Sequence, residues 1–360
     1  MESSFEPSPW ICRILMLLMV LALTLGSAAS AAPAAPWEVT KIDGHDYVSV
    51  DSIKRFYNFT GMSRAGATVK LKRGVRFTDV EKEKRNADKE LVMEFKVGGN
   101  DCLMNDVKFV FSEIIATVGD KVYVSRMDLA KLIDPVLRPT FIQNAGDFTT
   151  VVLDPGHGGK DPGATNPFGT EADYNLSVAN MVKSQLVAKG FKVVMTRDSN
   201  VFLSLQERVQ LANAIQENAI YISIHFNSGG RSARGIETFT LSPTGVSHYG
   251  SDLKASDNQT RAGNEHDSAN IALATAVHGW TLKQLAKNTL DRGIKRARFS
   301  VLSGVRHPAI LLEGGFMSHP FEARMIENPA YQKTLATGVV YAIGRYRSVV
   351  GRNPAAARQN

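Results

Sequence analysis

Two apolar, strand-like runs of the sequence are each followed by a histidine. Residues 151–153 lead into a Gly-rich turn that contains His157, and residues 221–224 lead directly into His225. One histidine at the end of a strand is more often a polar loop residue than a ligand. Two such histidines, one of them in a turn whose glycines let the backbone crowd a ligand, favour a metal site.

Two glutamates on or after apolar runs are candidates for acid–base chemistry. Glu313 directly follows the run 309–312, and Glu237 lies on the strand-like segment after His225. A carboxylate near a metal can take a proton from water and pass it on, whereas a glutamate before two glycines is, on its own, more often a solvated loop charge. Glu237 has two equally good interpretations: a partner that orients a ligand histidine, or a solvent-facing strand residue.

The segment 148–350 alternates β-rich apolar runs with stretches in which apolar residues recur at helical spacing. The β-rich runs lie at 149–153, 191–196, 219–224, 237–241 and 309–312. Strands that alternate with helices predict an α/β fold with a mostly parallel central sheet flanked by helices. In such folds ligands bind beyond the carboxyl ends of the strands, where His157, His225 and Glu313 would lie.

Residues 246–267 interrupt this alternation. The segment is rich in Ser, Asp, Asn, Gly and charged residues and has few apolar ones, so it is predicted to be a surface insertion, either a mobile lid or a plain loop. Residues 351–360 are predicted to be a disordered tail.

The segment 37–139 contains a weak internal repeat. Residues 44–51 resemble residues 119–125, and in both copies a strand-like run leads into a short amphipathic helix. The pattern predicts a small α+β domain and resembles the family named after the N-terminal domain of copper amine oxidases, which is often attached to exported wall enzymes. The resemblance implies a cell-wall-binding or localising role. His45 is the only histidine of this segment, so the sequence shows no copper site there.

Residues 1–31 are predicted to be a secretory signal peptide. The apolar run 14–25 follows Arg13 and precedes small residues that fit a cleavage site after Ala31. The run is about 12 residues, whereas a membrane span needs roughly 20, which argues against a permanent membrane anchor. Cleavage leaves Cys102 as the only thiol, so no internal disulfide is expected, and the protein is expected to be periplasmic or secreted.

Composition narrows the class of partner. The chain has 360 residues, of which 44% are apolar and 21% charged, a composition typical of a globular protein, and its length suggests two domains. The net charge of +7 favours an anionic partner, which could be nucleic acid, membrane or an acidic wall polymer. Export argues against nucleic acid.

The second region resembles the type 3 family of N-acetylmuramoyl-L-alanine amidases. Four spaced motifs occur in the order typical of that family: Asp154-Pro155-Gly156-His157-Gly158-Gly159, Glu171, Ser223-Ile224-His225 with Asn227, and Leu312-Glu313 with Gly315, Phe316 and Ser318. Supporting segments match at 196–198, 205–213 and 291–295. Several motifs in the right order are a much stronger signal than any single pattern.

The resemblance implies a zinc ion (Zn²⁺) held by His157, Glu171 and His225, with Glu313 as the catalytic carboxylate. Three protein ligands of this kind leave a fourth zinc position for water, as in catalytic zinc sites, and zinc lowers the pKa of that water to about 7. The implied reaction is hydrolysis of the amide bond between N-acetylmuramic acid and L-alanine in peptidoglycan.

Two other functions stay open at this point. A zinc peptidase acting on stem peptides would use the same metal and carboxylate, although the order of the motifs favours the amidase. A wall-binding protein that has lost catalysis is disfavoured, because all three ligand types and Glu313 are retained. Peptidoglycan is thus the expected partner of a monomeric enzyme, and the sequence does not tell whether a protein activator is needed.

Several residues near the motifs have roles that the sequence leaves undecided. Arg197 and Arg208 are either structural or bind a substrate carboxylate. Phe226 stands where the family usually has a small residue and could narrow the cleft, and His319 is assigned to the surface and not to the metal. The insertion 246–267 lies where related amidases can carry a segment that blocks the zinc.

Overall fold

A computed structural model describes residues 37–74, 90–286 and 289–351 of the chain. The predicted signal peptide, with its cleavage site, and all of the predicted tail except Gly351 lie outside the described residues. Within the described ranges, no helix is both long and apolar enough to cross a membrane.

The internal repeat of the first region corresponds to two strand–helix units. Strand β2 (His45–Ser49) leads into α2 (Val50–Phe56), and β9 (Lys121–Ser125) leads into α4 (Arg126–Asp128). In each copy the serine that ends the strand caps the helix, because its side chain accepts a hydrogen bond from a backbone N–H of the first turn. The two strands pair antiparallel in a sheet whose other strands are β1 (Val39–Ile42) and β8 (Ala116–Val118).

Strands of the first and second regions join in one larger sheet. Its first-region strands are antiparallel neighbours: β3 (Gly61–Ala65), β4 (Thr68–Gly74), β5 (Glu90–Lys96), β6 (Asp101–Met104) and β7 (Val107–Val110). Strand β7 lies beside β16 (Asp291–Ala297), with Phe109 opposite Ile294. Cys102 on β6 is buried and free, as a core residue would be.

The second-region part of this sheet is mixed: it contains one antiparallel pair of strands among parallel ones, so the sheet is not parallel throughout. Strands β13 (Lys192–Met195), β10 (Thr150–Pro155), β14 (Ala219–Asn227) and β17 (Ala309–Phe316) are parallel neighbours. The next strand, β15 (Ile236–Leu241), runs antiparallel to β17 and parallel to β16.

The direction of β15 follows from the length of the segment before it. A parallel arrangement needs a crossover of a dozen or more residues that returns the chain to the opposite sheet edge. Only residues 228–235 separate β14 from β15, so the chain turns back at the edge where β14 ends. The alternation of strands and helices did not reveal this reversal.

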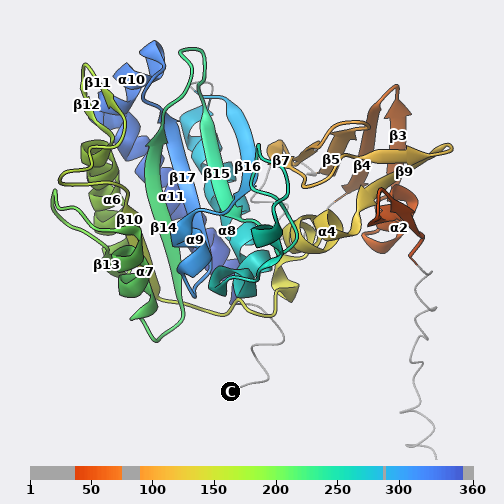
Figure 1. Cartoon of the computed structure of the whole chain (residues 1–360), viewed down its shortest axis with the longest axis horizontal. Helices are drawn as coiled ribbons and strands as arrows, with labels where there is room; N and C mark the ends of the chain where they lie inside the picture. The colour runs from red at the N-terminus through yellow and green to blue at the C-terminus, as the bar shows by residue number, and fades with distance from the viewer. Residues whose placement is uncertain (1–36, 75–89, 287–288, 352–360) are drawn as a thin grey trace, which may run out of the picture. The chain divides into compact units, whose positions relative to one another are not determined.

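Helices cover both faces of the second-region sheet (Figure 1). One face packs against α6 (Glu171–Val187), α8 (Asp267–Leu285) and α11 (Pro329–Val350), and its core includes Ile222, Ile224 and Leu312. The other face packs against α7 (Leu205–Asn213) and α9 (Ser300–Gly304) through Tyr221 and Leu311. Neighbours in sequence alternate between the two cores, as the two-residue period of a strand requires.

Short elements complete the described chain. Residues between β9 and β10 form a π-helix (Leu129–Ile133), α5 (Asp134–Leu137) and a 3₁₀ turn (Pro139–Phe141). The hairpin of β11 (Thr165–Asn166) and β12 (Gly169–Thr170) precedes α6, and α10 (Pro320–Glu327) follows β17.

The insertion 246–267 follows β15 and contains two 3₁₀ turns, η3 (Ala255–Asn258) and η4 (Ala262–His266). Because β15 is antiparallel to β17, with Glu237 opposite Glu313 and Phe239 opposite Leu311, the end of β15 lies at the sheet edge away from Glu313. The insertion therefore begins at the sheet edge opposite to the one where His157 and His225 lie.

Candidate metal centre and catalytic cleft

Three side chains that are far apart in the sequence meet at the carboxyl ends of β10 and β14. Nε2 of His157 lies 3.2 Å from Oε1 of Glu171, and Nδ1 of His225 lies 2.9 Å from the same oxygen. One possible ligand atom from each residue lies within 4.8 Å of the others. Two imidazoles and one carboxylate in this arrangement could hold a metal ion.

Glycines in the surrounding turns make room for the two rings. A Cβ on Gly156 would lie 2.0 Å from Cε1 of His225, and a Cβ on Gly163 would lie 2.6 Å from Oε2 of Glu171. His157 itself adopts a φ of 61°, a left-handed conformation that non-glycine residues rarely take. The backbone of this turn therefore passes so close to the three polar side chains that Gly156 and Gly163 cannot carry a Cβ without displacing them.

Glu171 is the first residue of α6, a position where a negative charge is favourable. Its Oε2 accepts a hydrogen bond of 2.9 Å from the backbone N–H of Ala164. Burial opposes ionisation of this carboxyl, but the hydrogen bonds from His157 and His225 outweigh burial, so the pKa of Glu171 lies well below its usual value. The side chain is thus a carboxylate, as a metal ligand must be.

Asp161 is a site residue that the sequence analysis missed. Its Oδ2 lies 2.8 Å from Nδ1 of His157, which fixes the ring and leaves Nε2 facing Glu171. Its other oxygen accepts a hydrogen bond of 3.1 Å from the N–H of Gly163. Ligand histidines commonly have such an acceptor. The available signal was an aspartate four residues after His157 in the same Gly-rich turn.

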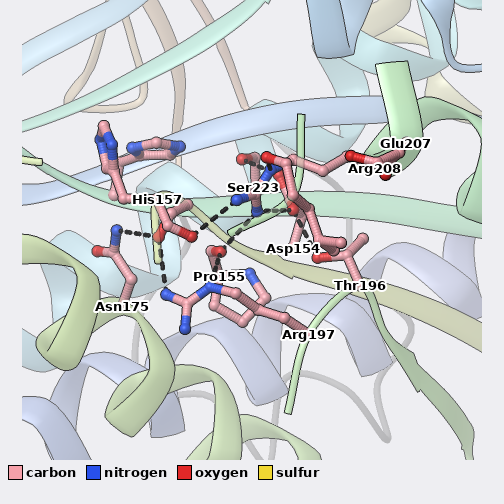
Figure 2. A network of polar contacts seen from close by, with 12 residues as sticks. Asp154, Pro155, His157, Asn175, Thr196, Arg197, Glu207, Arg208 and Ser223 are labelled. Carbon is pink, nitrogen blue, oxygen red and sulfur yellow. Dashed lines mark hydrogen bonds and ion pairs between the residues drawn. The ribbon is translucent and has the colours of Figure 1, made fainter. Parts of the chain in front are cut away.

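A buried ion pair between Arg208 and Asp154 supports the turn (Figure 2). Nη1 of Arg208 donates to Oδ1 of Asp154 at 2.7 Å, and Nη2 of Arg208 donates to the carbonyl of His157 at 2.7 Å. The carboxylate oxygens of Asp154 also accept hydrogen bonds from the hydroxyl groups of Thr196, Tyr221 and Ser223. Burial alone would raise the pKa of Asp154, but the charge of Arg208 and the hydroxyl donors lower it.

Arg197 supports the same turn from the other side. Its Nε donates to the carbonyl of Pro155 at 2.9 Å, and its Nη2 donates to the carbonyls of Gly156 and Ala172, each at 2.8 Å. Arg197 and Arg208 are both buried, and each binds backbone carbonyls. Both arginines therefore hold the backbone of this turn, which supports the structural interpretation of the two residues.

Asp154→Asn is expected to lower the free energy of unfolding by about 3 kcal/mol or more, because it leaves the charge of Arg208 buried without its partner. Since the folded pKa of Asp154 is depressed, the stabilisation is present at neutral pH and is lost as the pH falls below about 4. Urea unfolding at neutral pH would measure the change. Asp198→Asn removes an exposed carboxylate nearby and should alter stability little; equal stability of the two variants would contradict the role of the ion pair.

Glu313 lies next to the candidate ligands. On β17 it is directly opposite His225 of β14, and paired residues of neighbouring strands project from the same face of a sheet. Its Oε2 is buried and has no hydrogen-bond partner among the described residues. Burial raises the pKa of Glu313, and the nearby charges of Glu171 and Glu237 raise it further. A carboxyl with a raised pKa beside the ligands can exchange a proton with a bound reactant.

Glu237 fits neither of its two interpretations. It is buried, and Oε2 accepts a bond of 2.8 Å from Nζ of Lys295 while Oε1 is paired with Nε of Arg292. Both expectations were wrong because Glu237 faces the same side of the sheet as Glu313, where cations from the neighbouring strand β16 neutralise it. Glu237 contributes negative charge near Glu313 and does not contact a histidine ligand.

Phe226 does not narrow the cleft, contrary to expectation. As the neighbour of His225 on β14 it points to the opposite face, where it is fully buried and packs edge to face on Tyr174. Room for its ring comes from Gly314, where a Cβ would lie 2.8 Å from Cε1 of Phe226. His319 caps α10: its Nδ1 accepts hydrogen bonds from the N–H groups at 321 and 322 and is not part of the ligand cluster.

Comparison with known proteins identifies the family. A family model described as N-acetylmuramoyl-L-alanine amidase matches residues 151–345, which include all three candidate ligands and Glu313. The chain belongs to this amidase family.

Relatives of the amidase match the same half of the chain. An uncharacterised Bacillus subtilis protein, YqiI, is 34% identical over 197 residues, which are 55% of this chain and 84% of the relative. The N-acetylmuramoyl-L-alanine amidase AmiC of Neisseria meningitidis is 31% identical over 54% of this chain, and the match spans only 52% of AmiC. The catalytic domain of the amidase CwlV from Paenibacillus polymyxa is 30% identical with a TM-score of 0.47, covering 56% of this chain and 99% of that domain.

The amidase has a cleft of about 590 Å³ beside the candidate metal centre. Its polar wall includes His157, His225 and Glu313, and its apolar wall consists of Phe202, Leu203, Leu205, Phe299, Val301 and Leu311. None of the described residues 246–267 lines this cleft. The insertion is therefore not placed as a plug of the candidate centre, which argues against the inhibitory segment and the lid.

Proposed function

We propose that the protein is a zinc-dependent amidase that hydrolyses the bond between N-acetylmuramic acid and L-alanine in peptidoglycan. The observation that carries the proposal is the cluster of His157, Glu171 and His225 beside Glu313, inside the segment that the amidase family model matches.

The donor set suits zinc. Two imidazole nitrogens and one carboxylate oxygen are a three-ligand set found in catalytic zinc sites, and Asp161 holds the ring of His157 as the outer partner of such a ligand does. The depressed pKa of Glu171 keeps this ligand ionised. When bound, zinc polarises a carbonyl and makes water a better nucleophile at neutral pH.

Glu313 is the group that we assign to proton transfer. Its carboxylate lies beside His225 and lines the cleft, so it can accept a proton from the attacking water. The same carboxyl can then donate that proton to the nitrogen of the departing L-alanine. The raised pKa of Glu313 favours this second step, because a carboxyl that holds its proton at higher pH is available as an acid.

A zinc peptidase acting on stem peptides could use the same side chains. The family match favours the amidase, since the matched family is named for cleavage of the muramoyl–alanine bond. The two functions differ in the bond that is cut, and the products distinguish them.

The remaining predictions about the whole protein stay proposals. We propose that export, with cleavage after Ala31, brings the amidase to peptidoglycan in the periplasm or outside the cell, and that residues 37–139 bind or localise it there. The matches cover little more than half of the chain, so the resemblance of residues 37–139 to the copper amine oxidase N-terminal family stays a prediction. The need for a protein activator and the monomeric state of the enzyme also stay predictions.

Metal analysis of the purified protein tests the proposal. We expect one zinc ion per chain in protein prepared without chelators, because three ligands from rigid elements already converge. Activity toward muramoyl-L-alanine in protein that contains no divalent metal would contradict zinc dependence.

A further inference from the structure

The insertion 246–267 forms a wall of a second cavity, of about 670 Å³. The insertion supplies His248, Ser251, Asp252, Lys254, Ser256, Asp257 and Arg261, and the segment around α9 supplies Arg298, Ser300, Ser303 and Gly304. All of these except Gly304 carry a polar side chain. A cavity of this composition suits a hydrophilic, charged ligand better than an apolar one.

This cavity and the catalytic cleft share two wall residues, Arg298 and Ser300. Arg298 is held in place by the insertion and by Pro243 before it. Its Nη2 donates to the carbonyls of Val246 and Asp257 at 2.7 and 2.9 Å, and to the carbonyl of Pro243 at 2.8 Å. The insertion thus fixes the residue that separates the two cavities. The two cavities are therefore adjacent at Arg298.

The cavity has an excess of positive charge. Oδ1 of Asp257 lies 2.7 Å from Nε of Arg298, so these two charges compensate each other. Lys254 and Arg261 are exposed, and neither forms an ion pair with a carboxylate of the described chain, whereas Asp252 is the one remaining acid of the cavity wall. Two free cations against one acid favour an anionic ligand.

The backbone of both cationic residues is held by hydrogen bonds within the insertion. The N–H of Lys254 donates to Oδ2 of Asp257 at 2.8 Å, and the N–H of Arg261 donates to Oδ1 of Asn264 at 2.9 Å. These bonds lie at the start of the two 3₁₀ turns of the insertion, so the backbone of Lys254 and of Arg261 has a defined position on the cavity wall.

We propose that this cavity is a subsite for carboxylates of the stem peptide, bound by Lys254 and Arg261. The inference rests on the proposed function. In the uncut substrate the lactyl carboxyl of muramic acid is consumed in the amide, so the glycan strand carries no charge there, whereas the stem peptide carries several carboxylates. Positive charge next to the cleft therefore recognises the peptide side of the scissile bond and not the sugar side.

Calorimetry with a free stem tripeptide tests the subsite without catalysis. The probe is L-alanyl-γ-D-glutamyl-meso-diaminopimelate, compared with the same peptide whose carboxylates are amidated. We expect wild-type protein to prefer the acidic peptide. The double variant Lys254→Ala/Arg261→Ala should bind the acidic peptide roughly fivefold more weakly and the amidated peptide as before, since two exposed ion pairs contribute modestly.

Two exposed cations on α11 give a matched control. Lys333→Ala/Arg345→Ala removes the same net charge away from the cavity and should leave binding unchanged. Equal affinity of wild type for both peptides, or equal weakening in the two double variants, would overturn the subsite. Selective weakening in a protein that fails to cut muramoyl-L-alanine would support the subsite and contradict the proposed function.

Discussion

Replacing Glu313 with Gln is expected to lower kcat/KM for muramoyl-L-alanine cleavage by at least about 10²-fold while zinc stays bound. The amide of glutamine cannot accept and return a proton, but it has nearly the shape of the carboxyl. The three candidate ligands are untouched, because Glu313 lies on β17 and does not belong to the ligand cluster. Steady-state kinetics and metal analysis of the same preparation measure both effects.

Stability separates a catalytic defect from a folding defect in this variant. Oε2 of Glu313 is buried without a hydrogen-bond partner, so losing the acidic proton breaks no bond to the protein at that atom. The melting temperature of Glu313→Gln should therefore not fall. Glu327→Gln, which changes an exposed carboxylate at the end of α10, should keep full activity. Loss of zinc from Glu313→Gln would show that Glu313 is a ligand and that its assigned role is wrong.

His225→Ala is expected to remove both zinc and activity. Losing a partner that only orients a ligand already reduces metal affinity by about 10- to 100-fold, and losing the ligand itself should cost more. Chelation of the wild-type protein should have the same effect on activity, and added zinc should restore activity only in the wild type. Metal content after dialysis and activity after zinc addition measure these outcomes.

A histidine away from the cluster provides the control for that prediction. His45→Ala, in the first region, should keep zinc and activity, because His45 lies near Glu113 and does not belong to the ligand cluster. A zinc content of His225→Ala equal to that of His45→Ala would contradict the assignment of His225.

The sequence was most informative where chemistry coincides with the ends of strands. His157 and His225 follow apolar runs that become β10 and β14, and parallel neighbours must end at the same sheet edge. Glu313 could be placed there for the same reason. Glu171 could not be placed in this way, because it is the first residue of α6 and not the end of a strand. A carboxylate at the start of a helix has no distinctive local pattern, so Glu171 was identified only through resemblance to the family.

Features that depend on packing across the sheet could not be predicted from local patterns. Glu237 is neutralised by Lys295 and Arg292 of a neighbouring strand, and no spacing in the sequence links these residues. Phe226 faces Gly314, so the space for its ring is created by a residue on another strand. The reversal at β15 was predictable in principle, since residues 228–235 are too few for a crossover.

Mass spectrometry of digested cell-wall sacculi distinguishes an amidase from a peptidase, because it identifies the bond that is cut. We expect glycan strands with free lactyl carboxylates and intact stem peptides with a new L-alanine α-amine. Both products should disappear with Glu313→Gln. Muropeptides that keep L-alanine on muramic acid, with amines exposed further along the stem and no full-length stem released, would contradict the amidase assignment even if zinc and Glu313 were essential.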